Sequence, residues 1–212
     1  MIANAQRPFG SGFARTEIAR PFDRYKKEPP QDVRQADIKK NEALPELKSV
    51  WAKFIYDGFP EKTYRNVLQL IKGINYPAED ITKFSIALVE FQEEKDFAQK
   101  AGIFLSALIN NSADSDFIVI TKHLDATVDW MCFRNTKNVT IDGDVDCGFG
   151  NKMTAGKVIV TGSSDIFPTP DDGPTGGEIH IYGELYQPQH TRGAKLYHKG
   201  VLVYPEVDKN EA

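Results

Sequence analysis

The sequence predicts an α+β fold in which a helical region precedes a short parallel β-helix, a coil of stacked strands also called a β-solenoid. Apolar residues recur at helical spacing from residue 44 to about residue 111 and alternate with polar residues after that. Four alternating segments end in glycine, at Gly143, Gly162, Gly183 and Gly200, with spacings of 19, 21 and 17 residues. A repeat of this length is typical of a solenoid.

Residues 1–43 are predicted to form an extended or disordered arm. The segment has four prolines, and its nine Lys and Arg against six Asp and Glu give +3, which leaves −7 for the rest of a chain of net charge −4. It buries too little apolar surface to offset its ordering entropy. Arg7-Pro-Phe9 recurs as Arg20-Pro-Phe22. Because Arg and aromatic residues commonly anchor interfaces, we expect the arm to dock on a neighbouring subunit or partner; a chance repeat in a tail is the alternative.

Residues 44–111 are predicted to form helices. Pro60 suits the first turn of the second helix, where its missing N–H costs nothing, and Gly73 is placed to end that helix. A third helical segment opens at Pro77 and is followed by a fourth. Because Gly102 is the only interruption in this stretch, the two segments could also form one bent helix. The apolar residues predicted to face the core are Leu47, Val50, Trp51, Phe54, Ile55, Tyr64, Val67, Leu68, Ile71, Ile81, Phe84, Leu88, Phe91, Phe97, Ala101, Phe104, Leu105 and Leu108.

Residues 112–205 are predicted to form the solenoid, followed by an acidic tail at 206–212. When the four segments are aligned on their glycines, their residues fall into rows, because alternate residues of a strand point to the same face. The two rows predicted to point inward are Val139, Val158, Ile179 and Leu196, and Ile141, Val160, Ile181 and His198. The two rows predicted to point outward are Thr140, Ile159, His180 and Tyr197, and Asp142, Thr161, Tyr182 and Lys199.

The repeat extends beyond these four strands. Residues 117–121 align more weakly as an earlier rung, and residues 124–136 are expected to contribute another. Gly156, Gly177 and Gly193 precede three of the strands and predict a second corner in each coil.

The segment from Gly148 to Gly162 resembles the glycine-motif β-helix, because a Gly-x-x-Met-x-x-Gly corner leads into an alternating strand. That domain is found at the C-terminus of the glutamate synthase large subunit and in one of the subunits of formylmethanofuran dehydrogenase. The resemblance covers residues 139–203 and departs from the pattern between Ser163 and Thr175. It implies a right-handed coil and a structural or assembly role. It implies no activity, because the chemistry of those enzymes lies in other domains or subunits.

The residues assemble into no catalytic, cofactor or metal site. Asp142, Asp144 and Asp146 resemble the front of a calcium loop, but Cys147 and Met153 stand where that loop needs Gly and Glu. The four histidines include no pair at the spacing of zinc ligands. We therefore expect no catalytic residue, no metal and no cofactor, and we lean against an enzyme.

Composition limits the class of partner. The net charge of −4 and the acids interspersed in the arm disfavour nucleic acid, although an RNA-binding protein is a third possibility. There is no run of about 18 apolar residues, and the first residues lack the features of a signal peptide. We expect a cytoplasmic protein that does not act in membranes.

These observations favour a non-catalytic scaffold or assembly protein that acts through its solenoid faces and its arm, as a dimer or larger homo-oligomer or with a protein partner. The alternative is an accessory subunit or small enzyme with a site between helices and solenoid. Ile159, His180, Tyr182 and Tyr197 point outward and are partly apolar and rich in Tyr, as interfaces are. The apolar stripe of the helices must also be buried against some surface. This slightly favours the alternative in which helices of the same chain pack on this outward face.

Overall fold

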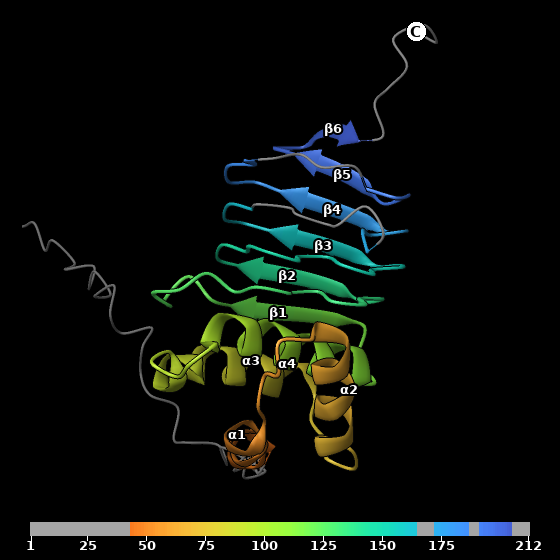
Figure 1. Ribbon diagram of the computed structural model, residues 1–212. Coiled ribbons are helices and arrows are strands. Elements are labelled where there is room, and N and C mark those ends of the chain that lie inside the picture. The colour runs from red at the N-terminus through yellow and green to blue at the C-terminus, as the bar shows by residue number, and fades with distance from the viewer. Residues whose placement is uncertain (1–42, 165–171, 187–190, 205–212) are drawn as a thin grey trace, which may run out of the picture. The chain divides into compact units, whose positions relative to one another are not determined.

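The computed structural model describes residues 43–164, 172–186 and 191–204. Apart from Ala43, the predicted arm lies outside these residues with Arg7, Phe9, Arg20 and Phe22, as does the tail. The helices are α1 (Ala43–Lys53), α2 (Pro60–Leu70), α3 (Ala78–Ala87), a 3-10 turn η2 (Leu88–Phe91) and α4 (Phe97–Asn111). The strands are β1 (Asp116–Ile120), β2 (Asn138–Asp142), β3 (Lys157–Val160), β4 (Glu178–Ile181), β5 (Lys195–His198) and β6 (Val201–Tyr204). The predicted fold class is confirmed (Figure 1).

The helices bury their apolar stripes mainly against one another, around the fully buried Trp51. Its ring lies 5.4 Å from Phe104 and from Phe91 and 6.0 Å from Phe84, measured between centroids. Ile55, predicted as core, is instead 77% exposed, because α1 ends at Lys53 and helical spacing no longer places the following residues.

The third and fourth helical segments are separate helices, so the bent-helix alternative is wrong. The break comes after η2, where Asp96 has a left-handed φ of 56° directly before α4. Gly102 lies inside α4 and does not interrupt it. A Cβ at this position would lie 1.7 Å from the Asp129 carbonyl oxygen, so the glycine allows α4 to approach a solenoid coil closely.

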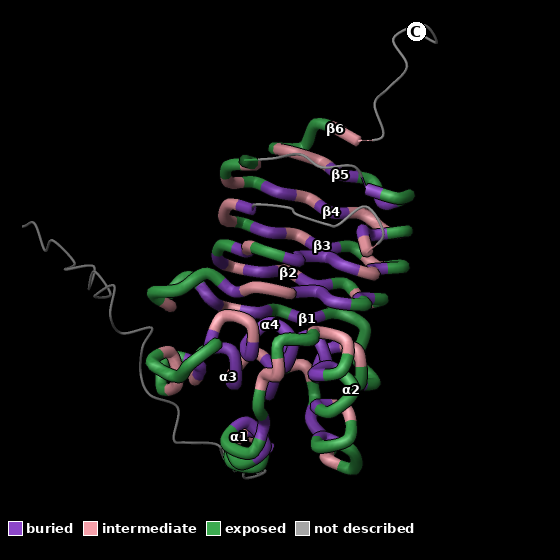
Figure 2. Tube along the Cα trace, viewed as in Figure 1, coloured by how far each residue is buried: buried purple, intermediate pink, exposed green. Residues whose placement is uncertain are grey.

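In the solenoid, β1 to β5 pair in parallel in chain order. The register confirms the inward rows: Val139, Val158, Ile179 and Leu196 are successive partners and are 2% exposed or less. Along β1 to β4, buried residues alternate with half-buried or exposed ones, as Figure 2 shows. A second side of the coil is marked by parallel bridges that join Val128, Val145, Ser164 and Leu185 in turn. Residues 124–136 therefore do contribute to a coil.

The first end of the solenoid is closed by α3, which runs along the free edge of β1 (Figure 1). The Thr82 hydroxyl donates to the Ile118 carbonyl at 2.7 Å, and the Ile120 amide donates to Ser85 Oγ at 3.0 Å. Two helix hydroxyls thus satisfy backbone groups that would otherwise be left unpaired at an edge strand.

The last parallel strand, β5, is covered by β6, which pairs with it in antiparallel orientation. A two-residue turn joins them, with positive φ at Lys199 (49°) and Gly200 (82°). Gly200 keeps the predicted alignment with Gly183, but it is a hairpin turn residue, so the expectation that it turns a corner of the coil is wrong. His198 ends the inward row, with Nε2 2.9 Å from the Gly183 carbonyl.

Candidate interaction surface on the solenoid

One row of side chains crosses the outer face of the sheet from end to end. Strand register places the members of this outward row side by side: Ile118, Thr140, Ile159, His180, Tyr197 and Leu202. Ile118 is 55% exposed and the others are half-buried. The predicted neighbours Ile159, His180 and Tyr197 thus lie together, and Tyr182, half-exposed, lies in the adjacent outward row.

The C-terminal part of the outward row is an aromatic platform. The rings of His180 and Tyr197 stack with centroids 4.3 Å apart and planes within 5° of parallel. His180 Nε2 lies 3.3 Å from a Glu178 carboxylate oxygen, and the Lys195 ammonium lies 3.8 Å from the other oxygen. The two rings therefore lie face to face, stacked along the direction in which β4 and β5 are paired.

Polar rows flank the outward row on both sides. On one side the successive residues are Asp116, Asn138, Lys157, Glu178 and Lys195. Asn138 Nδ2 donates to Asp116 Oδ1 at 2.9 Å. Hydrogen bonds from Ser115 and Asn138 lower the pKa of Asp116, which keeps it ionised at neutral pH. An apolar strip with a polar border is the usual anatomy of a protein interface.

The N-terminal part of the outward row contains a notch over Thr140. Thr140 stands between Ile118 and Ile159, and its smaller side chain leaves a groove of about 370 Å³ between these two isoleucines. Asp116 and Lys157 lie at its rim. The notch is wide enough for one large apolar side chain, and its two walls are apolar.

The helices do not cover this face, so the expected packing of helices over the outward row is wrong. Among the described elements, α3 packs along the edge of β1, and no helix makes extensive contact with β2 to β6. The physical reason is that backbone groups at the edge of β1 need hydrogen-bond partners, which the hydroxyls of α3 supply. The aromatic side chains of the helices are meanwhile packed against one another.

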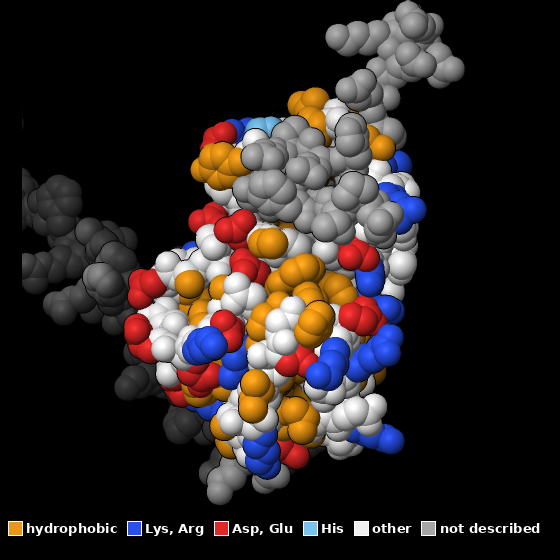
Figure 3. Space-filling view, viewed as in Figure 1, with side chains coloured by type: hydrophobic (Ala, Val, Ile, Leu, Met, Phe, Trp, Pro, Cys, Tyr) orange, Lys and Arg blue, Asp and Glu red, His pale blue; other side chains and the backbone are white. Residues whose placement is uncertain are grey.

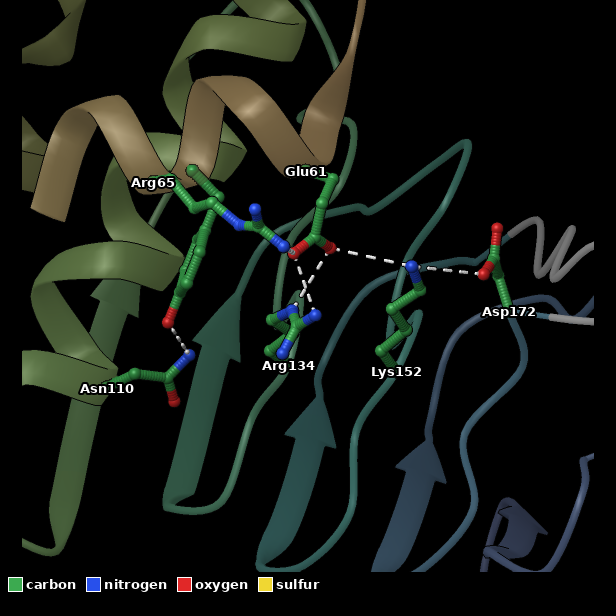
Figure 4. Close-up of polar contacts among 7 residues, drawn as sticks. Glu61, Arg65, Asn110, Arg134, Lys152 and Asp172 are labelled. Atoms are coloured by element: carbon green, nitrogen blue, oxygen red, sulfur yellow. Dashed lines mark hydrogen bonds and ion pairs between the residues drawn. The ribbon is translucent and has the colours of Figure 1, made fainter.

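A second contact joins the helices to the solenoid at its corners, and it is an ion-pair cluster around Glu61 of α2 (Figure 4). Two guanidinium nitrogens of Arg134 donate to the two oxygens of the Glu61 carboxylate, at 2.7 and 3.1 Å. The Lys152 ammonium lies 3.5 Å from one of these oxygens. Arg65 adds a contact at 3.2 Å. Burial by itself raises the pKa of Glu61, but Arg134 and Lys152 outweigh it and lower the pKa overall.

The sequence interpretation missed this cluster. Arg134 and Lys152 occupy equivalent places in successive coils, and both have positive φ, 57° and 58°. Their separation of 18 residues is close to the coil repeat, which is the signal that could have revealed them. Below them Asn110 Nδ2 donates to the Tyr64 hydroxyl and to the Phe133 carbonyl, each at 3.0 Å, so α2, α4 and the first coil are joined.

Nucleophilic and metal-binding side chains are dispersed over the described part of the chain. Burial raises the pKa of the Cys132 thiol, whereas Cys147 is exposed. Within residues 43–164, 172–186 and 191–204, no group of three or more His, Cys, Asp and Glu is arranged to hold a metal ion. None of the described helices combines the length and the hydrophobicity needed to cross a membrane. On the face drawn in Figure 3, acidic and basic side chains are intermixed.

Comparisons of the chain with family models, with curated proteins and with solved structures gave no match. The parallel solenoid is therefore established by the strand pairing itself.

Proposed function

We propose that the protein is a cytoplasmic, non-catalytic assembly protein, and that the outward row is the surface through which its copies associate. The observation that supports this most directly is that the outward row is partly apolar, bordered by polar rows and left uncovered by the described helices. Partly apolar exposed surfaces of this anatomy commonly mark interfaces. We also propose a relationship to the glycine-motif β-helix, in which the solenoid has a structural role; the Gly150 to Gly156 corner supports it.

The size of the face limits how tightly it alone could bind. Strands about 4.8 Å apart and residues about 3.3 Å apart make the six-stranded outer face roughly 24 Å by 13 Å, or about 300 Å². A stable interface buries about 800 Å² on each partner. The face would therefore give only a weak contact, and a second element must add area. We propose that the N-terminal arm, with its Arg-Pro-Phe repeats, is that element.

The test is the mass of the full chain in solution, measured by size-exclusion chromatography with light scattering. We expect a dimer or larger at tens of micromolar, and a monomer for Ile159→Glu, which places a charge in the middle of the outward row. The control is Ile55→Glu, the same substitution at an exposed isoleucine of the helical region. A wild-type monomer, or an Ile159→Glu variant that assembles like the wild type, would contradict the proposal.

The alternative of an enzyme or accessory subunit predicts a small ligand between helices and solenoid. The notch on the outer sheet face is lined only by solenoid residues, and a second groove, which lies between the end of α1 and α2, is lined only by residues of the helical region. No observation on the described residues favours that alternative. A thermal-shift screen with metals, nucleotides and glutamine-like ligands would reveal such a site as a rise in melting temperature.

A further inference from the structure

We infer that the notch over Thr140 binds an Arg-Pro-Phe tripeptide from the N-terminal arm of a second copy of this chain. The inference rests on the proposed assembly function and names the contact that adds the missing area. It comes from the geometry of the notch, from the charges around it, and from the number of tripeptides in each chain.

The spacing of the notch matches the spacing of the tripeptide. Asp116 precedes Ile118 by two residues on the same face of β1, so its carboxylate and the notch wall are about 7 Å apart along the strand. In Arg-Pro-Phe the cation and the ring are likewise two residues apart. Proline holds its own φ near −65° and biases the preceding residue to extended backbone, so the sequence Arg-Pro-Phe favours the extended form that this spacing requires.

The phenylalanine has an apolar pocket to enter. The Ile118 and Ile159 side chains form opposite walls, and Thr140 forms the floor. Moving a Phe ring from water into such a site is favourable because its apolar surface leaves water. The 55% exposure of Ile118 would fall at the same time, which adds to the gain.

The charges around the notch indicate that the Asp116 carboxylate is the partner of the arginine in Arg-Pro-Phe. Asp116 has a neutral neighbour, Asn138, and the nearest cation of its row is Lys157 at the other rim of the notch, two strands or about 10 Å away, which is about one Debye length. Glu178, at the aromatic platform, instead lies between Lys157 and Lys195. A guanidinium would be repelled there by both lysines, so the notch and not the platform fits Arg-Pro-Phe.

The count of tripeptides favours docking between copies. The sequence carries two of them, Arg7-Pro-Phe9 and Arg20-Pro-Phe22, whereas the outward row contains a single Thr between two isoleucines. The tripeptides are 13 residues apart, which spans up to about 47 Å of extended chain. An arm with two ligands, on a chain whose described outward row forms one such notch, can link two protomers.

The test is a charge exchange in the full chain. One variant carries Arg7→Glu and Arg20→Glu, and the other carries Asp116→Lys. Each alone is expected to self-associate at least tenfold more weakly than the wild type, because a like charge now faces the contact. Mixed in equal amounts, the two variants are expected to form a heteromeric species, because the acidic arm of one faces Lys at position 116 and the basic arm of the other faces Asp116.

A third variant, Thr140→Phe, fills the notch without a charge and is expected to weaken association while the far-UV circular dichroism stays unchanged. The inference is overturned if the mixture does not associate, or if association returns only when both exchanges are made in the same chain, which would show docking within one chain. It is also overturned if all variants assemble like the wild type. In that case the assembly function itself still stands, provided that Ile159→Glu abolishes assembly.

Discussion

Truncating Ile179 tests whether the solenoid has distinct inward and outward faces. Ile179 is fully buried in an inward row, between Val158 and Leu196 on the neighbouring strands. Ile179→Ala removes three carbons, which costs about 2.4 kcal/mol in transfer free energy, and the cavity left behind brings the expected loss of unfolding free energy to about 2–5 kcal/mol. A thin coil has few neighbours that can collapse into the gap, which favours the upper half of that range.

The matched comparison is Ile159→Ala, the same truncation one row further out on β3. Ile159 is half-buried, so we expect a loss of about 1 kcal/mol. Urea unfolding followed by circular dichroism measures both losses, and equal m-values would show that the denatured states are comparable. If Ile159→Ala cost as much as Ile179→Ala, or more, the assignment of the two faces would be refuted.

Two further predictions concern the junction of α4 with the first coil. Asp129→Asn should raise the melting temperature at neutral pH, because burial and then the charge of Asp146 raise the pKa of Asp129 despite its 2.6 Å hydrogen bond from Gln99. Because the pKa of Asp129 is raised in the folded state, the wild type loses stability as pH rises and this carboxyl ionises. The higher melting temperature of Asp129→Asn should therefore vanish below the ordinary aspartate pKa, where Asp129 is protonated in both the folded and the unfolded state. Gly102→Ala should lower stability by roughly 1–3 kcal/mol, because the clash with Asp129 outweighs a helix-propensity gain of about 1 kcal/mol.

Melting curves between pH 3 and pH 8 check the first of these, and a pH-independent difference between Asp129→Asn and the wild type would contradict it. Urea unfolding checks the second. A more stable Gly102→Ala variant would mean that α4 does not approach the coil as closely as the clash requires.

Local rules applied to the sequence were enough to predict the solenoid and most of its register. Side chains alternate strictly along a strand, so the positions of Val139, Val158, Ile179 and Leu196 relative to their glycines were enough to predict one inward row. Helical spacing likewise predicted the core around Trp51, because that spacing is a property of the local backbone. The same local rule failed at Ile55, where the helix had already ended.

How the ends of the coil are closed, and which face of the sheet the described helices leave uncovered, depends on contacts between residues far apart in the sequence. Gly200 looks like the other strand-terminal glycines in the sequence, yet it turns a hairpin, because the choice between another coil and a return strand depends on which partner the next strand finds in space. The packing of α3 on the edge of β1 depends on hydrogen bonds between residues about 35 positions apart. Periodicity carries no information on contacts of that range, and for the same reason the notch over Thr140 and the cluster around Glu61 emerged only when the coils were stacked.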